Sequence, residues 1–418
     1  MSTLLKSATI IDKSSQFNNQ KKDILITNGV IEKIENSIPS KPNNNIITLE
    51  NLHVSCGWFD TSVSFGEPGF EERETIANGL QTAAKSGFTK VAINSNTNPF
   101  IDNKSAVEFL VNKGKGFATT LFPIASLTQK SEGKEMAELF DMQQSGAIAF
   151  GDYTKSLAND NLMKVALLYA QNFNGLILSF PKNDSIAAGG LANEGNISTK
   201  LGLKGIPALA EHLQITRDLF LLEYTGGKLH IPTISTAESV KLIREAKKKG
   251  LQVTCSVSAH HLTLNDNELH GFDSNVKITP PLRTQKDCSA LIKAVKNGVI
   301  DIITSDHNPI DIEHKKVEFS AAKNGTIGLE SCFGAINSVL TLEESIEALT
   351  TKPASIFNIK KSCIAVGEKA DISLFNPKLT YTFTKENILS TSKNSAFLGK
   401  ELQGKAYGIF ANNQLVIN

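Results

Sequence analysis

The sequence predicts an α/β protein with a (β/α)8 TIM barrel at its centre and a small β-sandwich domain built from both ends of the chain. Two observations lead to this prediction. Between about residues 54 and 350, short runs rich in β-branched residues alternate with longer stretches of helical periodicity. Both ends of the chain instead have the pattern of short strands joined by tight turns, such as the turn at Asn28–Gly29.

The barrel requires eight strand–helix units, and the sequence offers them. Strands are expected at residues 53–64, 90–94, 118–124, 147–150, 176–180, 229–235, 252–258 and 301–305. Helices are expected, among other places, at residues 72–85, 207–223, 236–249 and 285–296. Pro207 suits the first position of its helix, where a missing backbone donor costs nothing. A doubly wound open sheet is the alternative, and it would need a reversal of strand order.

The ends of the chain differ in character from the middle. Residues 1–52 and 365–418 are expected to form the composite β domain, and residues 53–364 the barrel domain. The terminal segments carry turn signals between short apolar runs, whereas the middle carries the strand–helix alternation. The expected division is therefore one inserted barrel and one small domain assembled from the two ends.

Composition narrows the class of protein. Hydrophobic residues make up 40% and charged residues 20% of the chain, and the formal net charge of +1 gives no electrostatic case for binding nucleic acid or an anionic membrane. The five cysteines are odd in number and lack CxxC spacing, which fits a reducing compartment and not a zinc–thiolate cluster. No apolar run is long enough for a signal peptide or a membrane span. A cytoplasmic protein is expected.

Polar side chains gather at the end of the first expected barrel strand. In GWFDTSVSFGEPG, residues 57–69, period-2 alternation places Asp60, Ser62 and Ser64 on one side of the strand. The carboxyl ends of barrel strands build one site, so these residues should face the other strand ends. The expected neighbours there are Asp152, Phe180, Thr233, Asp306 and His307.

Several of these motifs resemble a known family. FDTSVSFGEPGFEERETIANG is similar to the dihydroorotase signature Asp-x-His-Val-His-x-Arg-Glu-Pro-Gly and the Glu-rich helix after it. The similarity continues through NSNTNP (94–99), FGDYTK (150–155), SAHHLTL (258–264), TPPLRTQKD (279–287) and TSDHNP (304–309). The chain resembles type I dihydroorotases, of the multifunctional-complex type, within the amidohydrolase superfamily. GEKADISLFNP (367–377) resembles the composite β domain of that superfamily.

The resemblance implies a site in which the metal ligands have been replaced. Family members form dihydroorotate from carbamoyl aspartate with one or two zinc ions. The positions of their metal-binding histidines fall at Ser62, Ser64, Phe180 and Thr233. The metal-bridging acid falls at Asp152 or one residue from it, and the catalytic aspartate at Asp306. Asn96 matches a substrate-side asparagine, whereas the substrate-binding arginine falls at Gly66, a second asparagine at Thr279 and a further histidine at Ile310.

Hydroxyls and a phenyl ring are poor substitutes for imidazole. Catalytic zinc needs about three nitrogen or carboxylate ligands, so Asp152 and Asp306 alone should hold a metal only loosely and no cofactor is expected. Asp306 is either a surviving weak general base or a cap of its loop. Ser62 and Ser64 are interpreted as a hydrogen-bonded remnant of the metal site. A re-purposed pocket with a serine nucleophile is the alternative, but no G-x-S-x-G elbow surrounds them.

The histidines outside these positions suggest little chemistry. His260 and His261 match a family motif in which they are not ligands, so a packing or loop role is expected and metal ligation is the alternative. His230 lies an odd number of residues before Thr233 on its strand and could point away from it. A core or surface role is the default for this histidine.

The leading functional hypothesis is an inactive dihydroorotase homologue in pyrimidine biosynthesis. By the resemblance, it would be a structural partner of aspartate transcarbamoylase and a homodimer. One alternative is an active cyclic amidohydrolase with a weak-metal or metal-free site on Asp152 and Asp306. Another is a sensor that binds dihydroorotate-like ligands without converting them. Loss of the arginine at Gly66 counts against both alternatives for the usual substrate.

Overall fold

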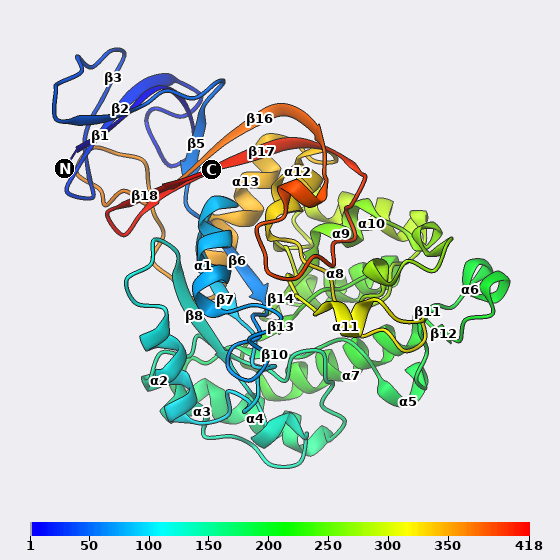
Figure 1. Cartoon of the computed structure of the whole chain (residues 1–418). Helices are drawn as coiled ribbons and strands as arrows, with labels where there is room; N and C mark the ends of the chain where they lie inside the picture. Colours follow the sequence, from blue (N-terminus) through cyan, green and yellow to red (C-terminus); the bar gives the residue numbers. More distant parts are fainter. Residues whose placement is uncertain (1) are drawn as a thin grey trace.

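The computed structural model describes residues 2–418 and contains two eight-stranded sheets (Figure 1). The larger part of the molecule is a parallel barrel with helices around it. Its strands are β6 (Trp58–Val63), β7 (Phe88–Ile93), β8 (Thr120–Ala125), β9 (Ala149–Phe150), β10 (Ile177–Leu178), β13 (Leu229–Ile231), β14 (Val253–Ser258) and β15 (Ile302–Thr304). They lie side by side in the order in which they occur along the chain.

The first and last strands of this sheet meet. Val63 pairs in parallel with His307, and the backbone N–H of Ser64 donates to the carbonyl of His307 at 2.7 Å. This contact closes the sheet into a barrel, as predicted, and the open-sheet alternative is wrong. No strand order is reversed.

Helices surround the barrel and connect its strands. The longer ones are α1 (Ile76–Lys85), α2 (Lys104–Lys113), α4 (Asp160–Ala170), α7 (Leu209–Thr225), α8 (Ala237–Lys248), α10 (Gln285–Lys296), α12 (Leu329–Asn337) and α13 (Leu342–Leu349). The shorter ones are α3 (Leu139–Gln144), α5 (Asp184–Ala187), α6 (Asn196–Leu201), α9 (Ala259–Thr263), α11 (Ile312–Lys315) and α14 (Thr351–Ile356). Within residues 2–418, none of these helices combines the length and the apolarity that a bilayer crossing requires.

Side-chain caps fix where several helices begin. The hydroxyls of Thr75, Thr236 and Thr284 accept hydrogen bonds from backbone N–H groups in the first turn of α1, α8 and α10, respectively. Helix α10 has the predicted bounds. Pro207 does not occupy the first position of its helix. Helix α7 begins at Leu209 with Ala208 as its N-cap residue, so Pro207 lies one residue before the cap.

The second sheet draws strands from both ends of the chain (Figure 1, top left). Its strands are β1 (Ser2–Ile11), β2 (Lys21–Thr27), β3 (Val30–Glu35), β4 (Asn44–Ile47), β5 (His53–Cys56), β16 (Ile372–Thr382), β17 (Glu401–Ala411) and β18 (Gln414–Ile417). A two-stranded sheet of β11 (Ala192–Asn193) and β12 (Gly205–Ile206) lies apart from both. The expected small domain from both termini is therefore present as a sheet.

The strand predicted at residues 53–64 is in fact two strands. Residues of β5 pair with β1 and β16 in the terminal sheet, whereas β6 pairs with β7 in the barrel. The chain changes sheets at Gly57, where an added Cβ would lie 2.0 Å from Oγ1 of Thr89. The domain division predicted at residues 52–53 and 364–365 stays a prediction, although residues 53–56 hydrogen-bond to the terminal sheet.

An aromatic cluster joins the two sheets. The Trp58 ring, which is fully buried, lies 4.7 Å from Phe333, 5.4 Å from Phe375 and 5.8 Å from Phe88, between ring centroids. Its indole N–H donates to Oγ of Ser55 at 2.9 Å. Because Phe375 belongs to β16 and Phe333 to α12, the cluster fixes the barrel floor against the terminal sheet.

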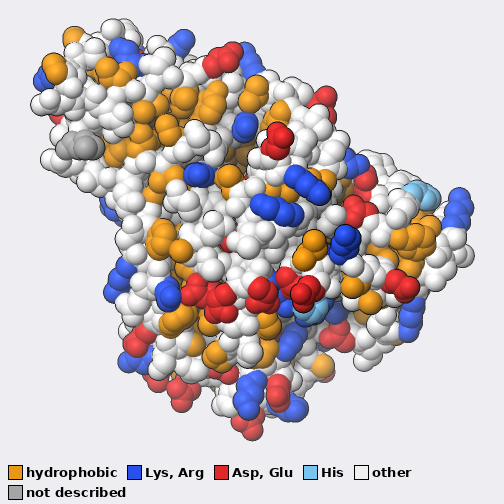
Figure 2. All heavy atoms as spheres, in the orientation of Figure 1, with side chains coloured by type: hydrophobic (Ala, Val, Ile, Leu, Met, Phe, Trp, Pro, Cys, Tyr) orange, Lys and Arg blue, Asp and Glu red, His pale blue; other side chains and the backbone are white. Residues whose placement is uncertain are grey.

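The outer surface is mixed in charge. Figure 2 shows basic and acidic side chains side by side over the barrel, and apolar side chains gathered over the terminal sheet. This pattern matches the formal net charge of +1.

Candidate active site at the barrel mouth

The serines at the end of β6 are held by asparagines from the next strand. Asn94 directly follows β7, and its Nδ2 donates to Oγ of Ser62 at 3.2 Å and to Oγ of Ser64 at 3.3 Å. Ser64 donates in turn to Oδ1 of Asn96 at 3.0 Å. Both hydroxyls are buried and engaged with protein groups. Asn96, predicted to face substrate, is a partner of Ser64 in this structure.

Asp306 is the acid at the centre of this cluster. Its Oδ1 accepts hydrogen bonds from Oγ of Ser62 at 3.0 Å and from the hydroxyl of Tyr153 at 3.3 Å. Burial raises the pKa of Asp306 to about 7. The nearby Asp60 also raises this pKa, whereas the hydrogen bonds from Ser62 and Tyr153 lower it. Near neutral pH, a large share of Asp306 is therefore protonated.

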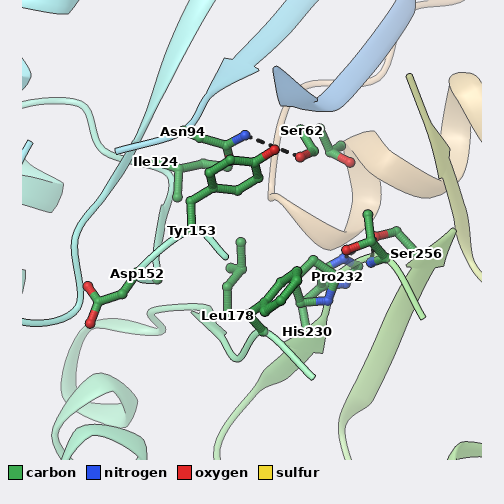
Figure 3. A pocket seen from close by; sticks show the side chains of 13 residues that line it. Ser62, Asn94, Ile124, Asp152, Tyr153, Leu178, His230, Pro232 and Ser256 are labelled. Atoms are coloured by element: carbon green, nitrogen blue, oxygen red, sulfur yellow. Dashed lines mark hydrogen bonds between the residues drawn. The ribbon is translucent and has the colours of Figure 1, made fainter. Parts of the chain in front are cut away.

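Tyr153, rather than Asp152, contacts Asp306. Figure 3 shows Tyr153 directed toward Ser62 and the carboxylate of Asp152 directed away from it. The carboxylate of Asp152 turns away and accepts from the backbone N–H groups of Leu127 and Thr128 at 2.9 and 3.1 Å and from the Thr128 hydroxyl at 2.6 Å. Asp152 thus anchors the loop after β8. Tyr153 is half-buried. Desolvation and the nearby Asp306 raise the pKa of its hydroxyl well above the usual value, so the hydroxyl is neutral and can donate.

Asp60 fastens the first barrel strand to the last. Its carboxylate is fully buried and accepts hydrogen bonds from the Thr304 hydroxyl and from the backbone N–H of Ser305. It also accepts from the backbone N–H of Ser62 at 3.2 Å. Asp60 therefore has a structural role that sets the position of Ser62.

The remaining predicted positions line a small cavity with neighbours that the sequence reasoning did not select. Phe180 and Thr233 are buried and line it together with Leu178, His230 and Ser256. His230 is buried, so it has a core role and not a surface role. It lines the same cavity as Thr233, so the expectation that it points away from Thr233 is wrong. Its ring nitrogens contact the hydroxyls of Thr254 at 2.8 Å and Ser256 at 3.2 Å. Burial lowers the pKa of His230 to about 3, so this imidazole is neutral.

The other histidines near the mouth serve packing. His307 Nδ1 accepts from the backbone N–H of Gly328 at 3.2 Å, at the beginning of α12. His261 contacts Oγ of Ser258 at 2.6 Å and the carbonyl of Pro280 at 3.0 Å. The buried His260 ring has no hydrogen-bond partner among residues 2–418, and its Nε2 lies 4.0 Å from Oδ2 of Asp306.

The cavity itself is small. Its volume is about 20 Å³, which holds roughly one or two water molecules. Tyr153, Leu178 and Phe180 are among the side chains that line it (Figure 3 labels the first two). With the lining side chains as they stand, this cavity has no room for a ring-sized molecule, although it is not fully enclosed.

The loop after β6 leaves no room for the arginine implied by the resemblance. A Cβ added at Gly66 would lie 1.7 Å from the carbonyl oxygen of Phe70. The same turn is held by a hydrogen bond from the N–H of Gly66 to the carbonyl of Glu74 at 2.8 Å. Gly66 is thus required by the backbone and carries no substrate-binding group.

The residues at the strand ends do not fit the zinc site that the resemblance implies. Neutral hydroxyls are weak zinc ligands, and Phe180 offers no donor atom. Asp152 faces a loop, and Asp306 is hydrogen-bonded to Ser62 and Tyr153. Within the described residues 2–418, no three His, Cys, Asp or Glu side chains come together in a group that could hold a metal ion.

Sequence reasoning missed Tyr153, Asn94, His230 and Ser256 as parts of this cluster. His230 and Ser256 lie in barrel strands, Asn94 directly follows β7, and Tyr153 lies three residues after β9. A signal was present for Asn94, the last residue of its predicted strand, and for Tyr153, which follows Asp152. The choice between Asp152 and Tyr153 depends on how the chain turns after β9, which the residue pattern does not specify.

Comparison with known structures and sequences defines the class. The fold matches L-hydantoinase (dihydropyrimidinase) from Arthrobacter aurescens with a TM-score of 0.86 and 20% identity, over 100% of this chain and 96% of that one. It matches dihydropyrimidinase from Brevibacillus agri NCHU1002 with a TM-score of 0.84 and 21% identity, over 100% of this chain and 95% of that protein. The profile of the amidohydrolase family matches residues 278–398. The fold is that of an amidohydrolase.

Comparison with related sequences identifies the family more narrowly than the fold does. Residues 53–239 match the profile described as dihydro-orotase-like. Proteins named dihydroorotase from Syntrophus aciditrophicus (strain SB) and Geobacter metallireducens are 38% identical over 423 residues and 37% identical over 412 residues. These alignments cover 100% and 97% of this chain and 99% and 97% of the relatives. The chain belongs to the dihydroorotase family.

Proposed function

We propose that this chain is a catalytically inactive member of the dihydroorotase family, lacking the metal-binding histidines of the type I enzymes. It would serve pyrimidine biosynthesis in the cytoplasm as a homodimer and a structural partner of aspartate transcarbamoylase. The observation that carries the proposal is the set of side chains at the barrel strand ends, where hydroxyls and a phenyl ring occupy the positions implied for metal ligands. There, the Tyr153 hydroxyl donates to Asp306 at 3.3 Å, beside a cavity of about 20 Å³.

Elementary chemistry supports the loss of activity. Bound zinc lowers the pKa of water from about 15.7 to about 7 and polarises the scissile carbonyl. The hydroxyls of Ser62 and Ser64 supply neither effect. Ser62 is hydrogen-bonded to Asn94 and Asp306, and Ser64 to Asn94 and Asn96. Each loss of about 1.4 kcal/mol of transition-state stabilisation lowers the rate about tenfold.

One observation favours a second candidate, a metal-free cyclic amidohydrolase. The pKa of Asp306 is raised to about 7, which suits a general base near neutral pH. General base catalysis alone contributes only about 10²–10⁴-fold, and Tyr153 would have to move to admit a substrate.

The decisive experiment measures metal content and turnover together. The purified chain is expected to contain no stoichiometric zinc and to show no dihydroorotate hydrolysis or carbamoyl aspartate cyclisation above buffer, with or without added zinc. The relative from Syntrophus aciditrophicus serves as the positive control. Bound zinc with turnover would contradict the proposal. Metal-free turnover that disappears in Asp306→Asn would support the second candidate instead.

The partnership needs a separate test. Mixed with aspartate transcarbamoylase from the same cell, the chain is expected to form a complex that elutes earlier than either protein in size-exclusion chromatography. If no complex forms over a range of concentration and salt, the partner part of the proposal is wrong, while the inactive state is unaffected.

A further inference from the structure

Helix α7 (Leu209–Thr225) buries several polar residues and exposes several large apolar ones. Its buried positions include three polar residues, Glu211, Gln214 and Asp218. Its exposed positions include four large apolar residues: Leu209, Leu213, Phe220 and Tyr224 are 50%, 42%, 74% and 79% exposed. An outer barrel helix normally shows the reverse arrangement.

The polar residues on the inside hold the helix in this orientation. Glu211 accepts from the backbone N–H of Ser235 at 2.9 Å and from Oγ of Ser239 at 2.6 Å. Asp218 accepts from Oγ of Ser179 at 2.6 Å, and its other oxygen pairs with Arg217 at 2.7 Å. Turning the helix would carry these carboxylates to the surface and leave their buried donors on Ser235, Ser239 and Ser179 without acceptors, at a cost of about 1–3 kcal/mol for each unpaired group. The outward position of the apolar residues is therefore built into the fold.

The exposed residues form one continuous stripe. At about 100° per residue, positions 209, 213, 216, 220 and 224 fall within an arc of roughly 80°, opposite the buried face. The stripe is about 22 Å long at 1.5 Å per residue. Its amino-terminal half is aliphatic, with Leu209 and Leu213, and its carboxy-terminal half is aromatic, with Phe220 and Tyr224. Thr216 lies at its centre.

A groove of about 510 Å³ runs beside the stripe, between α7 and α8. Leu219, Leu242 and Leu251 give it an apolar lining. Charged residues of both signs also line it: Glu223, Glu238 and Glu245 with Lys241, Arg244 and Lys249. These three acids and three bases balance, so the surface offers no net attraction to a strongly charged partner.

We propose that α7 and this groove form the interface of a homodimer, with the two α7 helices antiparallel across a two-fold axis near Thr216. The proposal rests on the homodimer part of the proposed function and names the surface. In this arrangement Phe220 of one copy meets Leu213 of the other, and Tyr224 meets Leu209. Each aromatic residue therefore packs against a leucine, and a charge-balanced rim can face itself without like-charge repulsion.

The exposed area is sufficient for the core of such an interface. Phe and Tyr side chains present roughly 150–250 Å² each, so Phe220 and Tyr224 together expose on the order of 300 Å². A stable interface needs about 800 Å² per partner, with an apolar centre and a polar rim. The leucines and the charged rim supply the remainder.

The first test measures mass in solution. The wild-type chain is expected to sediment as a dimer at micromolar concentration, and Phe220→Ser combined with Tyr224→Ser is expected to raise the dimer dissociation constant at least a hundredfold. The matched control is Ile312→Ser combined with Val366→Ser, which alters residues 70% and 54% exposed outside the stripe and should remain dimeric. Circular dichroism and thermal unfolding show that each variant is folded.

The second test locates the two-fold axis. In the proposed dimer, position 216 of one copy lies beside position 216 of the other. The variant Thr216→Cys is therefore expected to form a disulfide-linked dimer under mild oxidation. Leu209→Cys lies about 10 Å along the helix from the axis, so its two copies are about 20 Å apart, beyond the roughly 7 Å reach of a disulfide. The wild-type chain gives the background, because four of its five cysteines are buried and Cys363 is partly buried.

The outcomes separate this proposal from the proposed function. A dimer unaffected by the α7 variants, or a Leu209→Cys chain that cross-links as readily as Thr216→Cys, overturns the α7 surface alone. A wild-type monomer overturns the homodimer as well. Loss of transcarbamoylase binding with the dimer intact assigns the stripe to that partner and also overturns the proposal. None of these results bears on the turnover assay.

Discussion

Tyr153 and Asp306 determine the chemistry of the barrel mouth. The Tyr153 hydroxyl and Oγ of Ser62 both donate to Oδ1 of Asp306. Because Asp306 is buried and the nearby carboxylate of Asp60 repels a second negative charge, the charged form of Asp306 is disfavoured. A hydrogen-bonded cluster therefore occupies the strand ends, and two substitutions test it.

Removing the ionisable group should change the pH dependence of stability. The pKa of Asp306 is about 7 in the folded state and about 3.9 in an unfolded chain. Between these values only the unfolded state releases the proton, so the free energy of unfolding falls as pH rises from about 4 to about 7. The variant Asp306→Asn cannot ionise at this position. Its free energy of unfolding should therefore fall less over this pH range than that of the wild type, and the two losses should differ by up to about 4 kcal/mol.

Chemical denaturation at about pH 4.5 and about pH 7.5 measures this difference. Asp141→Asn, at an exposed position of α3, is the control and should follow the wild type. If Asp306→Asn and the wild type have the same pH dependence, the carboxyl group is not held in its neutral form.

Removing the hydroxyl of Tyr153 should weaken the cluster in a different way. Tyr153→Phe deletes one donor to Asp306 and is expected to cost about 1 kcal/mol of unfolding free energy. The hydrogen bond from Tyr153 lowers the pKa of Asp306, so its loss should raise that pKa above 7. Carboxyl ¹³C chemical shifts followed over pH give the pKa. An unchanged pKa in Tyr153→Phe would argue against the contact, and Tyr169→Phe on α4 is the control.

At the scale of elements, the junction between β5 and β6 holds the two sheets together. Gly57 connects them, and its backbone N–H donates to the carbonyl of Asp371 at 2.9 Å. A Cβ at this position would lie 2.0 Å from Oγ1 of Thr89 and 2.3 Å from Oδ1 of Asp371. Both neighbours are held by other contacts, including the ion pair of Asp371 with Lys90.

Gly57→Ala is therefore expected to lower the free energy of unfolding by about 1–3 kcal/mol, the usual cost of overpacking. Gly195→Ala is the matched control, since its nearest foreign atom would be 3.7 Å from the new Cβ. Denaturant unfolding of both variants measures the difference. Equal stability of the two variants would mean that the junction adjusts without cost.

At the scale of the whole molecule, contacts between protein groups close the barrel. Its first and last strands are joined by Asp60 with Thr304 and Ser305, and by the pairing of Val63 with His307. Dialysis against a chelator is therefore expected to leave the thermal unfolding midpoint unchanged within about 1 °C. The relative from Syntrophus aciditrophicus provides the comparison. A clear drop in the midpoint after chelation would reveal a structural metal in this chain.

The sequence by itself determined the architecture and the family of this protein. Strand–helix alternation fixed the eight barrel strands, because local periodicity reports which face of each element is buried. The quoted motifs also located Ser62, Ser64 and Asp306, since residues at strand ends of a barrel converge whatever the details of the loops.

Only the tertiary structure decided which side chains meet. It turned Asp152 toward the loop after β8 and Tyr153 toward Asp306, and it split the predicted strand 53–64 at Gly57. It also placed the apolar side of α7 outward, because buried partners of Glu211 and Asp218 lie on distant segments. Each of these results depends on contacts between residues far apart in the chain, which no local pattern specifies.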